Sequence, residues 1–453
     1  MVESSNKLPQ PGQYPEKLQH VGTVEVWTEI KQLSDKFGCT SLGEGAPNLL
    51  PPQFLRDAMV DAMGDAASNQ YSRSFGHPIF CNAIAKEYGK LYYEEFLGRP
   101  IDAMKEVLIS HGANTLLNVF CAALLNKDDE CVAFEPHFPT YLDHIEMAGG
   151  KPQFCPLRYD KEAKIWKYDI NELRAALGRE KCKLFILNSP HNPTGKVFTR
   201  EEYEEIGTML EKEFPHIIVL ADEVYDFLTF DGRVHVPFAA VGNNWERTVS
   251  LYSGGKLFSA TGWKLGWAIG PANIIHMGAI ISNTVWYTGN TPGQIAMGKT
   301  LHMAFEKQEG EELTYAQQVS ADFSKNRDFI TEALANPETY PMEPCVVEGG
   351  YFFMADISKC RDLIPAKYFE NHDYLPEDQR VGVNRVNMPD GSVPLDLAFC
   401  RWMACEKKLA IMPNSFFYGK QSAGQVSNTG YVRMAICKTH ESVKAGAAMF
   451  VPK

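Results

Sequence analysis

A regular alternation of short apolar runs with longer amphipathic stretches constrains the fold of this chain more than any other feature of its sequence. Apolar runs of this length are typical of buried strands, and the stretches between them have the three- and four-residue spacing of helices. The runs are "EVLIS" at 106–110, "ECVAFEP" at 130–136, "KPQFCPL" at 151–157, "CKLFILNSP" at 182–190, "IIVLADEVY" at 217–225, "TVSLYSGGK" at 248–256 and "LGWAIGP" at 265–271. Strands that alternate with helices predict an α/β fold, with a mostly parallel sheet and helices on both of its faces.

The rest of the chain predicts further units around this sheet. Residues 1–48 include a helix-like stretch, and we expect them to form an N-terminal arm and part of a small domain. The large domain then spans 49–324, and 325–453 forms a smaller α+β domain. Within it, the segment 365–393 is polar and rich in turn residues, which predicts a long surface loop or insertion. A chain of 453 residues is long enough for this division and for a buried cofactor.

Composition and charge limit the partners of such a protein. The chain has 44 basic and 56 acidic residues, and this net charge of −12 disfavours general binding to nucleic acid or anionic lipid. No apolar run approaches the roughly 20 residues of a membrane span, and the N-terminus resembles neither a secretory signal nor a transit peptide. The 11 cysteines lack the spacing of zinc ligands or of a disulfide framework, so we expect mostly buried thiols and no metal. These features predict a cytoplasmic protein and leave mitochondrial import open.

Polar side chains stand at the carboxyl ends of three predicted strands. They are Asn188 and Asn192 after the first, Asp222 and Tyr225 after the second, and Ser253 and Lys256 after the third. In open parallel sheets the ligand sits outside the carboxyl ends of the strands. We therefore expect these side chains to converge on one site.

The stretch "SGGKLFSATGWK", from Ser253 to Lys264, places Lys256 behind two glycines. It is no P-loop, because Ser250 and Leu257 stand where that motif needs a glycine and a hydroxyl residue. Spacing alone leaves two interpretations of Lys256. It is either a surface lysine beside a turn or an amine that forms a covalent bond with a carbonyl cofactor.

Four motifs in order carry a resemblance that favours the second interpretation. "SPHNPTGK", "ADEVY", "SGGKLFSATGWKLGW" and "GYVRMAI" resemble the class I aminotransferases, the fold-type I enzymes that use pyridoxal 5'-phosphate (PLP). The resemblance runs from about Trp27 to Arg433, nearly the whole chain. The stretches "LGEGAPNLLPP", "YSRSFGHP", "EPHFPTY" and "LAIMPNSFFY" are most similar to the kynurenine aminotransferase group, also known as glutamine transaminase K or cysteine-S-conjugate β-lyase.

The resemblance implies which residues contact the ring of PLP. Lys256 matches the lysine that forms the aldimine with PLP and moves a proton between the substrate Cα and the cofactor. Asp222 matches the acid that pairs with the pyridine nitrogen, and Tyr225 and Asn192 match the groups that hydrogen-bond the ring oxygen. Phe138 matches the aromatic residue that stacks on the ring, although the same residue is equally plausible as core.

The resemblance also implies a phosphate site. Its ligands are Gly112, Ala113, Asn114, Ser253 and Lys264. The first three lie at a predicted helix start, where backbone N–H groups and the helix dipole favour an anion. Plain helix capping explains the presence of Gly112 and Asn114 at this position equally well. Tyr71 matches a tyrosine that reaches the phosphate in the partner subunit, which implies a homodimer with shared active sites.

A substrate site follows from the same resemblance. Arg433 matches the arginine that binds the α-carboxylate, because a guanidinium makes two parallel hydrogen bonds to such a group. The other matching positions are Gly45, Asn192, Trp27, Trp286 and Tyr287. Glu44 and Ala46 depart from the group, which often has an amide and an aromatic residue there, and His191 stands where asparagine is common. These departures leave the preferred amino donor and keto acid acceptor open.

The implied activity is transfer of the amino group of an aromatic or long apolar L-amino acid, such as kynurenine, phenylalanine, glutamine or methionine, to a 2-keto acid. A β-lyase that uses the same site on cysteine S-conjugates is one alternative. A catalytically retired homologue that acts as a binding protein is another, and the retention of Lys256, Asp222, Tyr225 and Arg433 opposes it.

Overall fold

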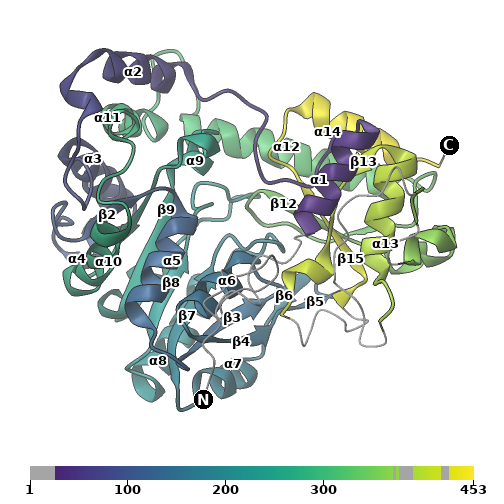
Figure 1. The fold of residues 1–453 in the computed structure, drawn as a ribbon, viewed down its shortest axis with the longest axis horizontal. Coiled ribbons are helices and arrows are strands. Elements are labelled where there is room, and N and C mark those ends of the chain that lie inside the picture. Colours follow the sequence, from purple (N-terminus) through teal and green to yellow (C-terminus); the bar gives the residue numbers. More distant parts are fainter. Residues whose placement is uncertain (1–25, 371–373, 377–390, 420–427, 453) are drawn as a thin grey trace, which may run out of the picture.

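The structure is a computed structural model that describes residues 26–370, 374–376, 391–419 and 428–452 (Figure 1). Its centre is a seven-stranded sheet in the order β2-β10-β9-β8-β7-β3-β4. The strands are β2 (Val107–Ser110), β3 (Glu130–Glu135), β4 (Lys151–Pro156), β7 (Cys182–Asn188), β8 (Ile218–Asp222), β9 (Thr248–Ser253) and β10 (Gly266–Ile269). Only β10 pairs with its neighbours in the antiparallel sense. The predicted mostly parallel sheet is confirmed, and each apolar run supplies one strand.

Helices cover both faces of this sheet (Figure 1). One face carries α5 (Ala113–Leu124), α6 (Thr140–Met147) and α10 (Ala272–Val285), and the other carries α7 (Ile170–Leu177) and α8 (Arg200–Glu213). On β3, Cys131 and Ala133 pack against the first group, whereas Val132 and Phe134 pack against the second. Except in the edge strand β4, nearly all strand residues are buried, which explains why most of the apolar runs are nearly continuous rather than alternating.

A second, antiparallel sheet has four strands in the order β11-β12-β15-β14. They are β11 (Glu343–Pro344), β12 (Phe352–Asp356), β14 (Met412–Pro413) and β15 (Tyr431–Ala435). Its hydrophobic core is shared with α1 (Val26–Phe37), α12 (Tyr315–Ala335), α13 (Leu395–Trp402) and α14 (His440–Ala447). This is the smaller α+β part of the fold. The domain boundaries after residues 48 and 324 stay a prediction, and α12 runs through the second of them.

The remaining elements lie around these two sheets. They are β1 (Thr40–Ser41), which pairs in parallel with β13 (Leu409–Ala410), the hairpin of β5 (Arg158–Asp160) and β6 (Ile165–Lys167), and the helices α2 (Gln53–Gly64), α3 (Pro78–Tyr88), α4 (Glu94–Leu97), α9 (Gly254–Leu257) and α11 (Thr291–Thr300).

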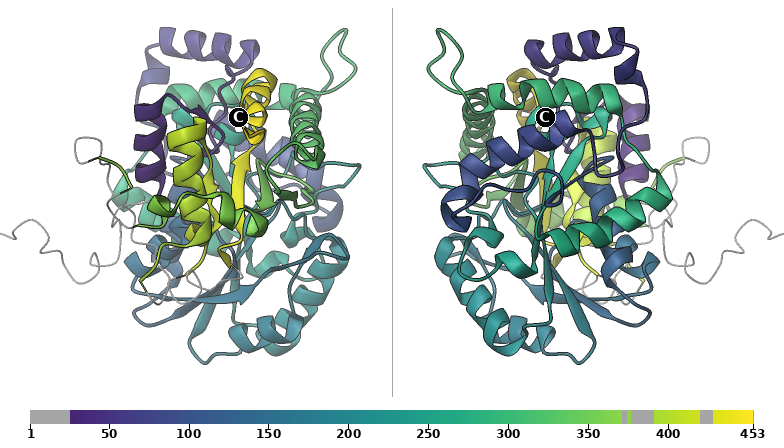
Figure 2. Two further views of the ribbon diagram at one scale, coloured as in Figure 1. Left: turned by 90° about the vertical axis from the view of Figure 1, so that its right-hand side faces the viewer. Right: turned by 90° about the vertical axis from the view of Figure 1, so that its left-hand side faces the viewer.

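The N-terminal helix α1 is fixed to the C-terminal part of the chain by a buried ion pair. Arg401 Nε donates to Glu29 Oε1 at 2.7 Å, and neither side chain is exposed. Tyr374 Oη donates to the same carboxylate oxygen at 2.9 Å. Figure 2 shows α1 lying beside α13, which carries Arg401. Since breaking one side of a buried pair costs about 3–5 kcal/mol, this contact holds α1 firmly in place.

The prediction that 365–393 is a surface loop or insertion is wrong about solvent exposure for several of its described residues. Tyr368, Tyr374 and Val393 are buried in the core of the second sheet. Polar and turn residues dominate the composition of this segment. The composition therefore does not reveal the few side chains that pack into the core. Residues 371–373 and 377–390 lie outside the described part of the chain.

Ten of the 11 cysteines are buried, which confirms the prediction of mostly buried thiols. Across the described ranges, no three or more His, Cys, Asp or Glu side chains gather in a way that could hold a metal ion. None of the described helices is both long enough and apolar enough to cross a membrane.

Candidate active site

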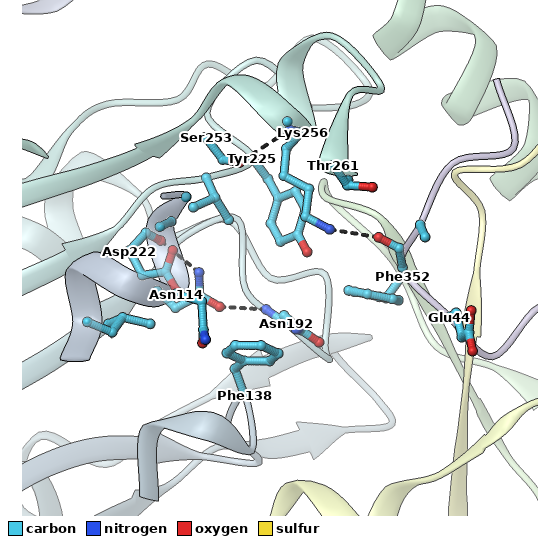
Figure 3. A pocket seen from close by; sticks show the side chains of 18 of the residues that line it. Glu44, Asn114, Phe138, Asn192, Asp222, Tyr225, Ser253, Lys256, Thr261 and Phe352 are labelled. Carbon is cyan, nitrogen blue, oxygen red and sulfur yellow. Dashed lines mark hydrogen bonds between the residues drawn. The ribbon is translucent and has the colours of Figure 1, made fainter. Parts of the chain in front are cut away.

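A cavity of about 410 Å³ lies at the carboxyl ends of the parallel strands, and residues of both sheets line it (Figure 3). Most of the predicted site residues meet on its wall: Trp27, Gly45, Gly112, Ala113, Asn114, Phe138, Asn192, Asp222, Tyr225, Ser253, Lys256, Lys264 and Arg433. The predicted convergence of the strand ends is therefore what the structure shows.

Lys256 lies in α9, the short helix that directly follows β9. Ser253 Oγ accepts a hydrogen bond from the backbone N–H of Lys256 at 3.3 Å, which caps the helix. The Lys256 amine donates to the carbonyl of Gly45 at 2.7 Å. Burial lowers the pKa of Lys256 to about 8, and Arg433 acts in the same direction. A substantial share of this amine is thus neutral near pH 8, which a base or nucleophile requires.

Asp222 ends β8 with its carboxylate buried in the cavity wall. Its Oδ2 accepts a hydrogen bond from Tyr141 Oη at 2.5 Å, whereas Oδ1 is buried without a partner in the described part of the chain. Burial raises the pKa of Asp222 to about 6, against the opposing effect of the Tyr141 hydrogen bond. Tyr141 could not be identified as this partner from the sequence, because its position among apolar residues of α6 is equally typical of core.

Arg433 lies in β15 and is almost fully buried. Its Nη1 donates to Asn192 Oδ1 at 3.1 Å and its Nη2 to the carbonyl of Gly43 at 2.8 Å, while Nε has no partner among the described residues. The guanidinium carbon lies 3.8 Å from the ring centre of Phe352 and 4.5 Å from that of Phe417. Burial lowers the pKa of Arg433 to about 9. A cation held in place by two aromatic rings and two hydrogen bonds is suited to bind an anionic group.

The helix start after Gly112 and the side chain of Lys264 lie on the same part of the cavity wall. Gly112 has φ +89° and directly precedes α5, and Ala113 and Asn114 of its first turn also line the cavity. A Cβ placed on Gly112 would lie 3.8 Å from Lys264 Nζ. Free backbone N–H groups beside a lysine amine are typical of phosphate sites. The Asn114 side chain is held by Thr140 Oγ1, which donates to Asn114 Oδ1 at 2.7 Å.

Aromatic rings form the wall opposite Lys256. The ring centre of Phe138 lies 6.2 Å from that of Trp27 and 5.7 Å from that of Tyr141. Trp27 also packs edge-on against Phe416, at 5.1 Å. Phe138 lines the cavity rather than lying wholly in the core, so it is available to a flat ligand.

Three predicted site residues do not reach this cavity within one chain. Tyr71 is 83% exposed, and its ring packs edge-on against Tyr287 at 5.8 Å. Trp286 packs against His111 at 5.3 Å. The roles of these three residues stay predictions. For Tyr71, the predicted contact is with the phosphate in a second subunit.

Two of the three departures noted in the sequence lie on the cavity wall, namely Glu44 and Ala46. His191 does not line the cavity, and its Nδ1 lies 2.8 Å from Thr194 Oγ1. Burial lowers the pKa of His191 to about 3, so the ring is neutral at physiological pH. Sequence reasoning did not identify Phe352, which supports Arg433 and is one of many aromatic residues in strand-like stretches.

Known proteins resemble this chain over nearly its whole length. Residues 38–449 match the family model for aminotransferase class I and II. A kynurenine–oxoglutarate transaminase from Dictyostelium discoideum is 34% identical, with 91% of this chain and 90% of that protein aligned. Kynurenine–oxoglutarate transaminase 3 of Homo sapiens is 33% identical, covering 93% of this chain and 86% of the human protein.

Solved structures agree with this assignment. Bna3p from Saccharomyces cerevisiae superposes with a TM-score of 0.82 at 25% identity, over 96% of this chain and 97% of that one. YbdL from Escherichia coli, at 24% identity and a TM-score of 0.79, shares the fold over 96% of this chain and 98% of its own. The chain therefore belongs to the family of class I and II aminotransferases.

Proposed function

We propose that the cavity binds PLP and that the chain transfers amino groups from aromatic or long apolar L-amino acids to 2-keto acids, as a transaminase of the kynurenine–oxoglutarate type. The observation that carries this proposal is the meeting of Lys256, Asp222 and Arg433 around one cavity. The names of the relatives support the substrate class.

The residues present fit the cofactor. Asp222 Oδ1 is a buried acceptor with no partner among the described residues, and a protonated pyridine nitrogen supplies the donor that such an atom needs. The N–H groups that follow Gly112, together with Lys264, suit a phosphate. Phe138 and Tyr225 line the space between these two anchors.

When bound, PLP supplies an electron sink for the negative charge that develops on the amino acid Cα. The residues of this chain would do the rest. Arg433 would bind the α-carboxylate and orient the substrate, so that the Cα–H bond faces Lys256. The Lys256 amine, with its pKa lowered to about 8, would take the proton from Cα and hold it on Nζ. The rings of Trp27, Phe138 and Phe352 would exclude water from the reacting atoms.

We also infer a homodimer. The exposed Tyr71 and Tyr287 lie outside the chain's own cavity, and a second subunit would bury them. The β-lyase alternative uses the same residues, and no contact in the structure favours it over transamination. A retired homologue is opposed by membership in an enzyme family together with an intact Lys256.

The proposal is tested by assaying the PLP-loaded protein with phenylalanine, methionine, glutamine and kynurenine, each with 2-oxoglutarate and with pyruvate as acceptor. We expect formation of the matching keto acid, and loss of at least about a hundredfold in kcat for Lys256→Ala, since removing a catalytic base costs about 10²–10⁴. Lys164→Ala, at an exposed lysine, is the matched control. A Lys256→Ala protein with wild-type turnover would refute the proposal. Pyruvate and ammonia released from a cysteine S-conjugate without a keto acid would show lyase activity.

A further inference from the structure

Five charged side chains line the active-site cavity: Glu44, Asp222, Lys256, Lys264 and Arg433. The proposed function uses four of them, for the ring nitrogen, the reacting proton, the phosphate and the α-carboxylate. Glu44 is left over. A carboxylate in a cavity with apolar walls is costly unless it has a partner, so its presence calls for an explanation.

The backbone on either side of Glu44 is held by hydrogen bonds from Arg433 and Lys256. Gly43 O accepts a hydrogen bond from Arg433 Nη2 at 2.8 Å, and Gly45 O accepts one from Lys256 Nζ at 2.7 Å. Glu44 therefore sits on a short segment whose position is tied to the site that receives the α-carboxylate and the α-amine. In Figure 3, Glu44 and Asp222 lie at opposite ends of the site, with Phe352 between them.

The Glu44 side chain is half-buried and forms no hydrogen bond or ion pair with any described residue. It also borders a smaller cavity of about 90 Å³, on whose wall Lys31 lies. Lys31 already forms an ion pair with Asp35 at 3.1 Å. The hydrogen bond and the charge of Asp35 raise the pKa of Lys31 more than the charge of Glu44 does. On the inner side, Arg433 donates hydrogen bonds to Asn192 and to the carbonyl of Gly43.

On the active-site side, the neighbours of Glu44 in the cavity wall are apolar, namely Trp27, Ala46 and Phe352. On the outer side, Ser34, Asp35 and Ser41 line the smaller cavity. A half-buried charge acts on a ligand group next to it more strongly than a fully exposed charge does, because less water screens it. It favours an N–H donor or a cation and opposes a second carboxylate.

We propose that Glu44 biases substrate choice, favouring amino acids whose side chains end in an N–H donor over those whose side chains end in a second carboxylate. This inference rests on the proposed function, since it takes the α-carboxylate to be bound by Arg433. It applies to both half-reactions, because donor and acceptor occupy the same cavity. We therefore expect 2-oxoglutarate to be a weaker acceptor than a monocarboxylic keto acid such as pyruvate, although two relatives are named for oxoglutarate.

Glutamine and glutamate give a sharp test, because they have nearly the same shape and differ in a terminal amide against a carboxylate. We measure kcat/KM for both donors, with phenylalanine as a neutral reference, in the wild type and in Glu44→Gln. The wild type is expected to prefer glutamine over glutamate. In Glu44→Gln the glutamine-to-glutamate ratio falls by about tenfold or more, mainly through the KM of glutamate, while phenylalanine changes by no more than about twofold.

Lys31→Gln is the matched control, because it removes the cation on the outer side of Glu44 and leaves the cavity wall intact. If Glu44 serves only Lys31, both variants shift the ratio equally, and the inference is overturned. An unchanged ratio in Glu44→Gln, or a parallel fall for phenylalanine, also overturns it. Failure of the proposed function looks different, since the wild type would then not transaminate phenylalanine at all.

Discussion

Burial at the level of single residues sets the protonation of the two groups on which the chemistry depends. Lys256 and Asp222 both line the cavity, and burial shifts the pKa of each toward the neutral form. The two pKa shifts have different consequences for function. A neutral lysine is useful to a base, whereas a carboxylate that resists ionisation becomes useful only when a cationic partner binds beside it.

The Lys256 amine should lose its proton near pH 8 in the cofactor-free protein. Competitive labelling with acetic anhydride, read by peptide mass spectrometry, reports the neutral fraction of each lysine. We expect labelling of Lys256 to rise with pH and level off above about pH 8, while a lysine model peptide keeps rising toward its pKa of about 10.4. Labelling of Lys256 that follows the model peptide would contradict the lowered pKa.

Asp222→Asn should stabilise the cofactor-free protein while it removes activity. The folded-state pKa of Asp222 is about 6, above the unfolded value of about 3.9, so the folded state holds more protons between these values and loses stability as pH rises through them. At pH 7 the cost is about 2–3 kcal/mol, and an uncharged amide avoids it. Urea unfolding without PLP should show this gain at pH 7 and a much smaller one near pH 4. A variant less stable than wild type at pH 7 would contradict the account.

Contacts between whole elements fix the helix start that is proposed to bind the phosphate. Strand β10 passes directly under the first turn of α5, and a Cβ on Gly266 would lie 2.7 Å from the backbone nitrogen of Ala113. Gly266→Ala should displace that turn and weaken PLP binding by at least about tenfold, since near-ideal placement of several N–H groups is lost. Gly262→Ala is the control, because its Cβ would meet nothing within 4 Å. Equal PLP affinity of the two variants, measured by absorbance titration, would be evidence against phosphate binding at this helix start.

Most strands of the sheet could be predicted from the sequence because they are buried on both faces and have nearly continuous apolar runs, with the half-exposed edge strand β4 as the exception. The antiparallel direction of β10 could not, since a buried strand looks the same in either direction. Asp222 and Lys256 became candidates because polar residues at the ends of parallel strands indicate a ligand site, and the family resemblance assigned their roles. Tyr141 and Phe352 were missed, because an aromatic side chain that supports a charged group has the same local pattern as one that fills a core.

The active site depends on the whole molecule, because residues as far apart as Trp27 and Arg433 line one cavity. No local pattern predicts such contacts, and the family resemblance supplied them. The same holds for Tyr71, whose predicted partner is a second subunit. A structure of one chain shows only that it is exposed.

Mixing two inactive variants tests the shared site. If Tyr71 completes the partner's site, dimers that combine Lys256→Ala with Tyr71→Ala contain one intact site. Co-refolding equal amounts should then restore about a quarter of wild-type activity, because half of the dimers are mixed and each has one of two sites intact. Mixing without subunit exchange is the control. Activity no higher than the sum of the parent variants would contradict a site shared through Tyr71.

Reductive trapping tests whether Lys256 holds PLP in this cavity. The protein is loaded with PLP, reduced with sodium borohydride and digested, and the peptides are analysed by mass spectrometry. We expect one pyridoxyl-phosphate group per chain, on Lys256 within "SGGKLFSATGWK", and loss of this label after prior incubation with an amino donor. An unlabelled Lys256, or equal labelling of exposed lysines such as Lys164, would contradict it.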